Sequence, residues 1–329
     1  MTDGRNQTIL REYILLGLSQ HHNVEIVLFL LCLGIYSMNL MGNSLLIGLN
    51  WLDPRLHSPM YFFLSNLAFM DLVGTSSFVP LMLVNFLQTQ KTISFPGCAL
   101  QMYLTLALGT TECLLLAVMA YDRYVAICQP LRYPEIMSGQ RCTWMAGLSW
   151  GVAFANSLLQ SILVWRLPFC GHNVINHFFC EILAVVKLAC GDISLNALSL
   201  KLATTFLSLT PLLLISLSYV FILAAIFRVP SAAGRRKAFS TCSAHLAVVV
   251  IFYGTISFMY FRPKAKDPDS DKLIALFYGL ATPSLNPVIY SLRNAEVKAA
   301  AGALLRGELL ARKMPLFQGC TASLWARRG

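Results

Sequence analysis

Seven long apolar stretches, separated by shorter polar ones, run along this chain of 329 residues. About 20 apolar residues in a helix match the hydrocarbon thickness of a bilayer, and a backbone in lipid must satisfy its own hydrogen bonds. Hydrophobic residues make up 57% of the chain and charged residues 12%, against about 45–50% and about 25% in soluble domains. We therefore predict an all-α membrane protein, a seven-transmembrane helix bundle, with helices near Glu25–Leu49, Pro59–Leu87, Ile93–Cys128, Cys142–Val164, Ala197–Arg228, Phe239–Phe261 and Lys272–Leu292.

The basic residues predict how this bundle lies in the membrane. If the first loop is cytoplasmic, the cytoplasmic segments carry the entire formal charge of +10, and everything else sums to zero. The positive-inside rule then gives a multi-pass membrane protein with an extracellular segment 1–24, one bundle domain 25–292 and a cytoplasmic tail 293–329. Asn6 opens a glycosylation sequon on the external side. Nucleic acid is not an expected partner, because no basic stripe with interleaved aromatic residues occurs outside these loops.

Four cysteines fall on the predicted external side. Cys98 begins the third helix, and Cys170, Cys180 and Cys190 lie between the fourth and fifth helices. Four cysteines allow three pairings, which the sequence does not distinguish. The spacing of Cys170 and Cys180 with two intervening histidines also allows a metal site, but an oxidising compartment favours disulfides.

Several polar residues interrupt the apolar stretches. Asn43, Asp71, Glu112 and Asn286 are predicted to lie within helices one, two, three and seven. Ionisable groups inside a membrane commonly mark functional sites, although they also form simple hydrogen bonds between helices. Two acids at mid-depth repel each other unless a cation or a proton lies between them. We therefore expect a bound sodium ion or a shared proton there, and no other cofactor.

Four blocks of sequence carry a family resemblance. They are Leu56–Leu67 (LHSPMYFFLSNL), Met119–Cys128 (MAYDRYVAIC), Lys237–Leu246 (KAFSTCSAHL) and Pro283–Asn294 (PSLNPVIYSLRN). In this order and spacing, up to about Leu305, the chain resembles the odorant receptors, a branch of the rhodopsin-like G-protein-coupled receptors. The helix-six sequence Phe252–Thr255 (FYGT), in place of the tryptophan-proline pair of the wider class, also fits odorant receptors.

The resemblance implies particular disulfides and a particular switch. It implies disulfides Cys98–Cys180 and Cys170–Cys190, and a sodium site around Asp71, Glu112 and Asn286. It places Asp122-Arg123-Tyr124 at the G-protein end, where Asp122 pairs with Arg123 at rest. On activation Arg123 would be released to face the G protein, with Tyr219 and Tyr290 moving toward it. Pro287 interrupts the hydrogen-bond ladder of helix seven and supplies a deformable point.

The resemblance also implies a ligand pocket in the outer half of the bundle. The amine-binding aspartate and the retinal lysine of related receptors are replaced by Thr105 and Leu280, which argues against both ligand types. We expect a small, neutral, volatile odorant and coupling to a stimulatory G protein that raises cyclic AMP. The expected ligand contacts are Thr105, Leu106, Gly109, Thr110, Ala203, Leu207, Tyr253, Ile256, Tyr260, Leu276 and Gly279.

Other function classes fit less well. A transporter or channel would show inverted repeats, interrupted helix pairs or pore-lining charges, none of which is evident. An enzyme is not expected, because the histidines have no protease or triad spacing and no phosphate loop occurs. Beyond the bundle, Asn294–Leu305 places Val297, Ala301, Leu304 and Leu305 on one side, which predicts a short interfacial helix. The basic pairs Arg312-Lys313 and Arg327-Arg328 are expected to be solvated or to contact anionic lipid.

Overall fold

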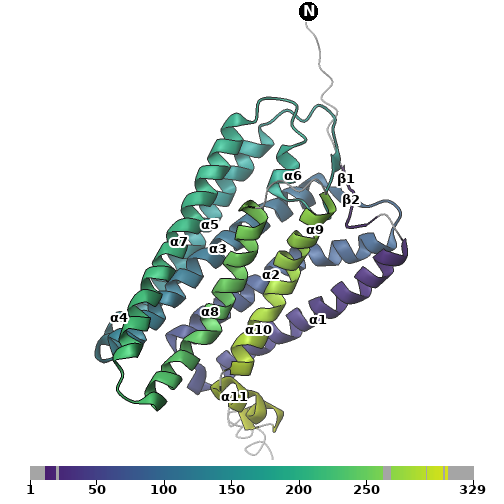
Figure 1. Ribbon diagram of the computed structural model, residues 1–329. Coiled ribbons are helices and arrows are strands. Elements are labelled where there is room, and N and C mark those ends of the chain that lie inside the picture. Colours follow the sequence, from purple (N-terminus) through teal and green to yellow (C-terminus); the bar gives the residue numbers. More distant parts are fainter. Residues whose placement is uncertain (1–11, 20–21, 262–267, 294, 307, 310–329) are drawn as a thin grey trace, which may run out of the picture.

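The computed structural model describes residues 12–19, 22–261, 268–293, 295–306 and 308–309 (Figure 1). Six helices in this part of the chain are long and apolar enough to cross a membrane, and the bent helix α8 makes seven. The predicted seven-helix bundle is therefore confirmed. Its helices are α1 (His22–Leu52), α2 (Pro59–Leu87), α3 (Phe95–Cys128), α5 (Gly139–Trp165), α7 (Ser194–Arg228), α8 (Ala232–Phe261) and a seventh made of α9 (Pro268–Leu276), the π-helical turn η3 (Phe277–Ala281) and α10 (Thr282–Arg293).

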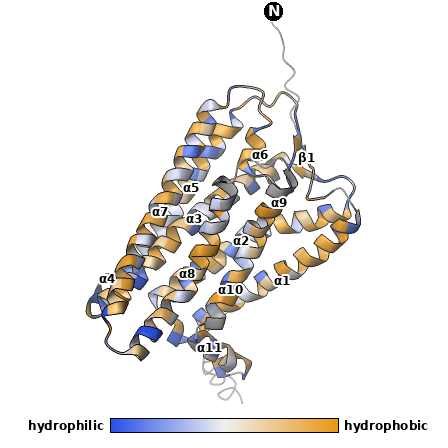
Figure 2. Cartoon of the chain, in the orientation of Figure 1, coloured by the Kyte–Doolittle hydropathy of each residue, from blue (hydrophilic) through white to orange (hydrophobic). Residues whose placement is uncertain are grey.

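Helix α3 lies at the centre of the bundle. It packs against α2, α5, α7 and α8. Of its most apolar stretch of 18 residues, 61% is buried in the bundle, whereas the figure for α1 is 17%. Large apolar side chains also cover the outside of the bundle: Val27, Leu213 and Val250 are 63–68% exposed. Figure 2 shows this hydrophobic colouring over much of each long helix. Such a surface suits lipid, so the chain is a multi-pass membrane protein.

Helix α8 begins seven residues before the apolar stretch that predicted it. The added residues include Arg235 and Arg236, which are good helix formers but are polar. A hydropathy pattern detects only the part of a helix that lies in lipid. The helix therefore continues past the predicted boundary with its basic residues at the aqueous end.

The seventh helix spans the predicted range without a break, but it contains a π-helical turn that was not predicted. The π-helical turn η3 ends just before Pro283, which has no N–H to donate to the preceding turn. Pro287 likewise leaves the carbonyl of Pro283 without its helical partner, and Asn43 Nδ2 donates to that carbonyl at 3.4 Å. Two prolines four residues apart thus distort the helix, and Asn43 of α1 compensates for one lost bond.

Short elements mark the two ends of the bundle. At one end, β1 (Glu12–Leu15) pairs antiparallel with β2 (Thr92–Ser94) and parallel with β3 (Val174–Ile175), beside α6 (Ile182–Val186). We call this the disulfide end. The opposite end, the Arg123 end, carries η1 (Pro54–Leu56), η2 (Pro130–Arg132), α4 (Tyr133–Ile136) and α11 (Ala295–Leu305). The small sheet was not predicted from sequence, because its strands are too short to show a pattern.

Helix α11 follows the bundle, near the predicted interfacial helix. It packs against α1 and α10, but its buried face differs in part from the prediction. Val297, Ala300 and Ala303 are buried, whereas Leu305 is 89% exposed. Ala301 and Leu304 of the predicted face are half-buried and pack against the core, so Leu305 is the one predicted residue that does not. Asn6 and the basic pairs of the tail lie outside the described residues.

Candidate functional site

Two disulfides fix the loop between α5 and α7 at the disulfide end. Cys98 pairs with Cys180 and Cys170 pairs with Cys190, with Cα atoms 5.3 and 6.1 Å apart. Both pairings are the ones that the family resemblance implies. Because all four sulfurs are used in disulfides, they cannot serve as metal ligands, which removes the alternative of a metal site at these cysteines.

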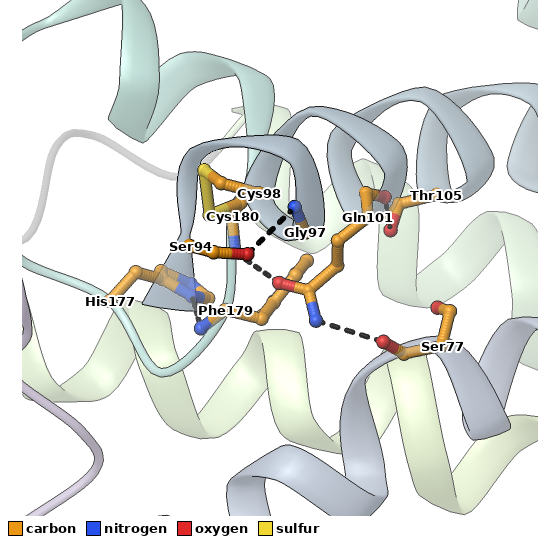
Figure 3. Close-up of a disulfide and its surroundings, with 9 residues drawn as sticks. All are labelled: Ser77, Ser94, Gly97, Cys98, Gln101, Thr105, His177, Phe179 and Cys180. Carbon is orange, nitrogen blue, oxygen red and sulfur yellow. Dashed lines mark hydrogen bonds between the residues drawn. A yellow bond between two sulfur atoms is a disulfide. The ribbon is translucent and has the colours of Figure 1, made fainter. Parts of the chain in front are cut away.

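Gln101 joins this loop to two helices (Figure 3). Its side chain is buried; Nε2 donates to the carbonyl of Ser77 at 2.9 Å, and Oε1 accepts from the backbone N–H of Cys180 at 2.7 Å. A buried amide with both halves paired stabilises one geometry, because moving the loop would leave polar groups unsatisfied. Gln101 therefore holds the loop against α2 and α3, a role that sequence reasoning missed.

His177 lies buried in the same loop. Its Nδ1 accepts from the N–H of Phe179 at 3.4 Å, and its ring stacks on Phe178. Burial, together with the positive charges of Lys272 and Lys187, lowers the pKa of His177 to about 3. The imidazole is thus neutral at neutral pH, and it packs as an aromatic group.

A cavity of about 130 Å³ lies beneath this loop, between α3, α5, α7, α8 and the seventh helix. Seven of the residues predicted to contact a ligand line it: Thr105, Leu106, Gly109, Thr110, Ala203, Leu207 and Ile256. Sequence reasoning did not name the others, which are Met102, Cys113, Asn156, Phe179, Glu181, Ile182, Thr204, Ser208, Ala275 and Tyr278. The cavity is mostly apolar, with a few hydroxyls and one carboxylate.

Three predicted ligand contacts do not line this cavity. Tyr253 is buried in the core, with its ring against Phe252. Leu276 packs against a separate cluster around Phe78, and Gly279 lines a neighbouring smaller cavity. Tyr260 lies outside the residues whose side chains the structure describes.

The π-helical turn explains two of these differences. Ala275 and Tyr278 line the cavity, each one residue before a predicted contact. A π turn holds one extra residue, so residues before the turn are displaced by one position relative to a regular helix. The loop residues Phe179, Glu181 and Ile182 were predictable in principle, since they adjoin Cys180, which is tied to α3.

The smaller cavity, about 60 Å³, holds the predicted intramembrane acids. Asp71 and Glu112 both line it, and Asn286 Nδ2 donates to Asp71 Oδ2 at 2.9 Å. Glu112 Oε1 is buried, with no hydrogen-bond partner among the described residues. Buried oxygens of this kind suit a hard cation or a shared proton. This cavity shares Thr105, Gly109 and Tyr278 with the larger one, so the two are adjacent.

At the Arg123 end, hydrogen bonds occupy both carboxylate oxygens of Asp122. Arg123 contacts Oδ2 at 2.7 Å, and the hydroxyl of Tyr133 donates to Oδ1 at 2.7 Å. Asp122 is fully buried, so this pairing compensates for its desolvation. Sequence reasoning missed Tyr133, which belongs to the short helix α4. Tyr124, half-buried, packs against the ring of Phe221.

Two tyrosines predicted to move toward Arg123 lie buried near this end. Tyr219 bonds to Nδ1 of His245 at 2.7 Å, and Nε2 of His245 lies 3.1 Å from the carbonyl of Leu116. His245 therefore links α7, α8 and α3, a role not predicted from its position in a sequence block. The hydroxyl of Tyr290 is buried, with no hydrogen-bond partner among the described residues. This hydroxyl therefore has unused donor and acceptor capacity.

The family model and the similar proteins all point to one family. A family model described as olfactory receptor matches residues 31–306. Human olfactory receptor 13C2 is 55% identical over 307 residues, covering 91% of this chain and 96% of that protein. Human olfactory receptor 2S2 is 56% identical over 301 residues, with coverages of 89% and 94%. Human olfactory receptor 13D1 is 54% identical over 311 residues, with coverages of 94% and 90%.

Proposed function

Because this chain belongs to the olfactory receptor family, we propose that it is an odorant receptor that binds a small, neutral, volatile molecule and activates a stimulatory G protein, raising cyclic AMP. It is a receptor and not an enzyme. The observation that carries the proposal is the cavity beneath the disulfide-bonded loop, lined by α3, α7, α8 and the seventh helix. An apolar cavity of about 150 Å³ holds benzene, so one of about 130 Å³ suits a volatile of similar size.

The contacts at the Arg123 end support a switch in this proposal. Asp122, Arg123 and Tyr133 form one arrangement, and the hydroxyl of Tyr219 is bonded to His245. A ligand that favours a second arrangement would release Arg123 toward the G protein. A sodium ion or a shared proton between Asp71 and Glu112 would stabilise the resting arrangement, since that small cavity adjoins the ligand cavity.

The charge distribution supports an orientation in the plasma membrane. The disulfide end would face outward, because disulfides form in oxidising compartments, and the basic Arg123 end would face the cytoplasm. Glycosylation at Asn6 and lipid contacts of the basic tail belong to the same proposal. In this orientation the ligand reaches its cavity from outside, and the switch faces the G protein.

Leu207→Trp tests the ligand site in cells that express a stimulatory olfactory-type G protein. The larger ring fills the cavity, so the cyclic AMP response to an activating volatile should fall about a hundredfold or vanish. Leu213→Trp on the same helix is the matched control, because Leu213 is 68% exposed on the outside of the bundle. Equal responses from both variants, with verified surface expression, would contradict the site.

A further inference from the structure

The two cavities in the middle of the bundle share a wall. Thr105, Gly109 and Tyr278 line both of them. Thr105 and Gly109 belong to α3, whereas Tyr278 reaches that helix from the π-helical turn η3. The larger cavity measures about 130 Å³ and the smaller one about 60 Å³. A ligand in the larger cavity therefore ends where Tyr278 meets α3.

Gly109 allows Tyr278 to come this close to α3. A Cβ atom at position 109 would lie 2.9 Å from the hydroxyl oxygen of Tyr278, which is closer than real Cβ atoms come to their neighbours. The tyrosine hydroxyl thus occupies the space that a side chain at position 109 would fill. The ring of Tyr278 also lies against Phe252 of α8, with the ring centroids 5.9 Å apart. Tyr278 is therefore packed between α3 and α8, where it closes the passage to the smaller cavity.

The backbone that carries Tyr278 is packed closely on α2. The next residue, Gly279, lines only the smaller of the two cavities. A Cβ atom at Gly279 would lie 3.1 Å from the ring of Phe78, so the seventh helix and α2 are in tight contact there. Tight packing of this kind resists small displacements. Moving Tyr278 away from α3 would disturb the contact at Gly279.

The smaller cavity differs from the larger one in its chemistry. It contains the buried acids Asp71 and Glu112, and Glu112 Oε1 has no hydrogen-bond partner among the described residues. An apolar group placed beside a buried acid gives that acid no hydrogen bond, which is unfavourable. A ligand that extends past Tyr278 would therefore need a polar end that donates to Glu112.

We propose that Tyr278 is a specificity-determining residue that limits the length of the ligand. This deepens the proposed function and rests on it. A compact odorant of about the size of benzyl alcohol fits on one side of the tyrosine, whereas the far end of a longer chain meets the tyrosine and finds no space. The receptor thus selects compact, ring-shaped odorants over extended ones. A smaller residue at position 278 would join the two cavities and admit the longer molecules.

Two phenylalkanols of different length test the limit, namely benzyl alcohol and 5-phenylpentan-1-ol. Both end in a hydroxyl, which can donate to Glu112 if the chain reaches the smaller cavity. Binding is measured as the ligand concentration that raises the Tm of the purified receptor in lipid nanodiscs, which needs no G protein. Longer chains also enter lipid more readily, so the quantity compared between variants is the ratio of the two concentrations in the same nanodiscs.

Tyr278→Ala should shift this ratio in favour of the longer alcohol by about tenfold or more. Each methylene that gains space in a cavity adds about fourfold in affinity. Phe277→Ala is the matched control, because Phe277 belongs to the same turn but is 47% exposed, and it should leave the ratio unchanged. An unchanged ratio in Tyr278→Ala, or no stabilisation by either alcohol, would overturn the proposal.

A conservative pair of variants keeps the aromatic ring and tests the wall itself. Tyr278→Phe removes only the hydroxyl oxygen, so the ratio should shift toward the longer alcohol by about fourfold, the value for one methylene. Adding Gly109→Ala to Tyr278→Phe places a methyl group where the hydroxyl was, and the original ratio should return. A merely structural role of Tyr278 would weaken the binding of both alcohols alike, with no reversal by the added methyl, and that result would also overturn the proposal.

A cyclic AMP assay with the same alcohols distinguishes this inference from the proposed function. Stabilisation of the purified receptor without any cyclic AMP response would contradict the coupling proposed above but leave the length limit standing. Cyclic AMP responses with the same ratio of potencies in Tyr278→Ala and in the unmodified receptor would support the receptor function and overturn the length limit.

Discussion

The two ends of the bundle are held by different kinds of contact. At the disulfide end, the loop over the cavity is held by two disulfides and a three-stranded sheet. The side chain of Gln101 adds two hydrogen bonds, one to the loop and one to α2. At the Arg123 end, the contacts described above are hydrogen bonds made by side chains, such as Asp122 with Tyr133 and Tyr219 with His245. Side-chain bonds exchange partners more easily than disulfides or strand pairings do. We therefore expect the disulfide end to be the more rigid of the two. In the proposed function that end serves recognition and the Arg123 end serves switching.

Removing the Cys98–Cys180 disulfide should have the largest effect. This bond closes a loop of 82 residues, against 20 for Cys170–Cys190, and the entropic cost of loop closure in the unfolded chain grows with loop length. We expect Cys98→Ala/Cys180→Ala to lower the free energy of unfolding by about 4 kcal/mol, and Cys170→Ala/Cys190→Ala by about 3 kcal/mol. The Tm of each purified variant measures this. A larger loss for the second pair would contradict the expected order.

Gln101→Met should have the next largest effect. The substitution removes the hydrogen bonds of Gln101 to the Cys180 N–H and the Ser77 carbonyl, at about 1–3 kcal/mol for each unsatisfied group. Thermal unfolding should shift down, and odorant potency should fall because the loop is no longer fixed. Gln88→Met, at the exposed end of α2, is the control. If ligand potency is unchanged in Gln101→Met, the loop does not depend on this residue.

Acidification should weaken the disulfide end through His177. Its pKa is lowered to about 3 in the folded state, below the value of about 6.5 in an unfolded chain. The unfolded state therefore binds more protons between these values, so stability is full above about pH 6.5 and falls as the pH drops toward 3. At pH 5 we expect a loss of about 2 kcal/mol. The Tm of the purified receptor, measured between about pH 7 and pH 4, tests this predicted loss of stability.

Two histidine variants isolate that effect. His177→Asn keeps an acceptor near the Phe179 N–H but does not titrate over this range, so it should flatten the pH dependence of Tm. His172→Asn, at an exposed position in the same loop, should leave that dependence unchanged. A pH profile that is the same in both variants and in the unmodified receptor would assign the effect to other groups.

The bundle was predictable from sequence because a backbone in lipid must satisfy its own hydrogen bonds. Long apolar stretches must be helices in a membrane, and six of the seven predicted ranges begin and end within four residues of the observed elements. The exception is α8, whose first residues include Arg235 and Arg236. A hydropathy pattern does not detect a helix where it extends beyond the bilayer, so the predicted range began too late. The short strand Glu12–Leu15 escaped prediction because its pairing depends on segments 80 and 160 residues away in the chain, roughly.

The candidate site was predictable where regular helices form it, since predicted residues of α3, α7 and α8 all line the cavity. Thr105, Leu106, Gly109 and Thr110 lie on one face of α3, and all line the cavity. Glu181 was missed because a loop residue reaches the cavity only through the disulfide that precedes it. The shift from Leu276 and Gly279 to their preceding neighbours arises from a π turn, which no hydrophobic pattern reveals.

Arg123→Ala tests most directly whether recognition and switching are separate. We measure odorant binding by Tm shift and signalling by cyclic AMP on the same variant, with Arg132→Ala, at a side chain 67% exposed, as control. The account predicts that Arg123→Ala binds the odorant within about threefold of the unmodified receptor but raises no cyclic AMP, because only the switch is removed. Preserved signalling in Arg123→Ala, or loss of odorant binding in a folded variant, would contradict it.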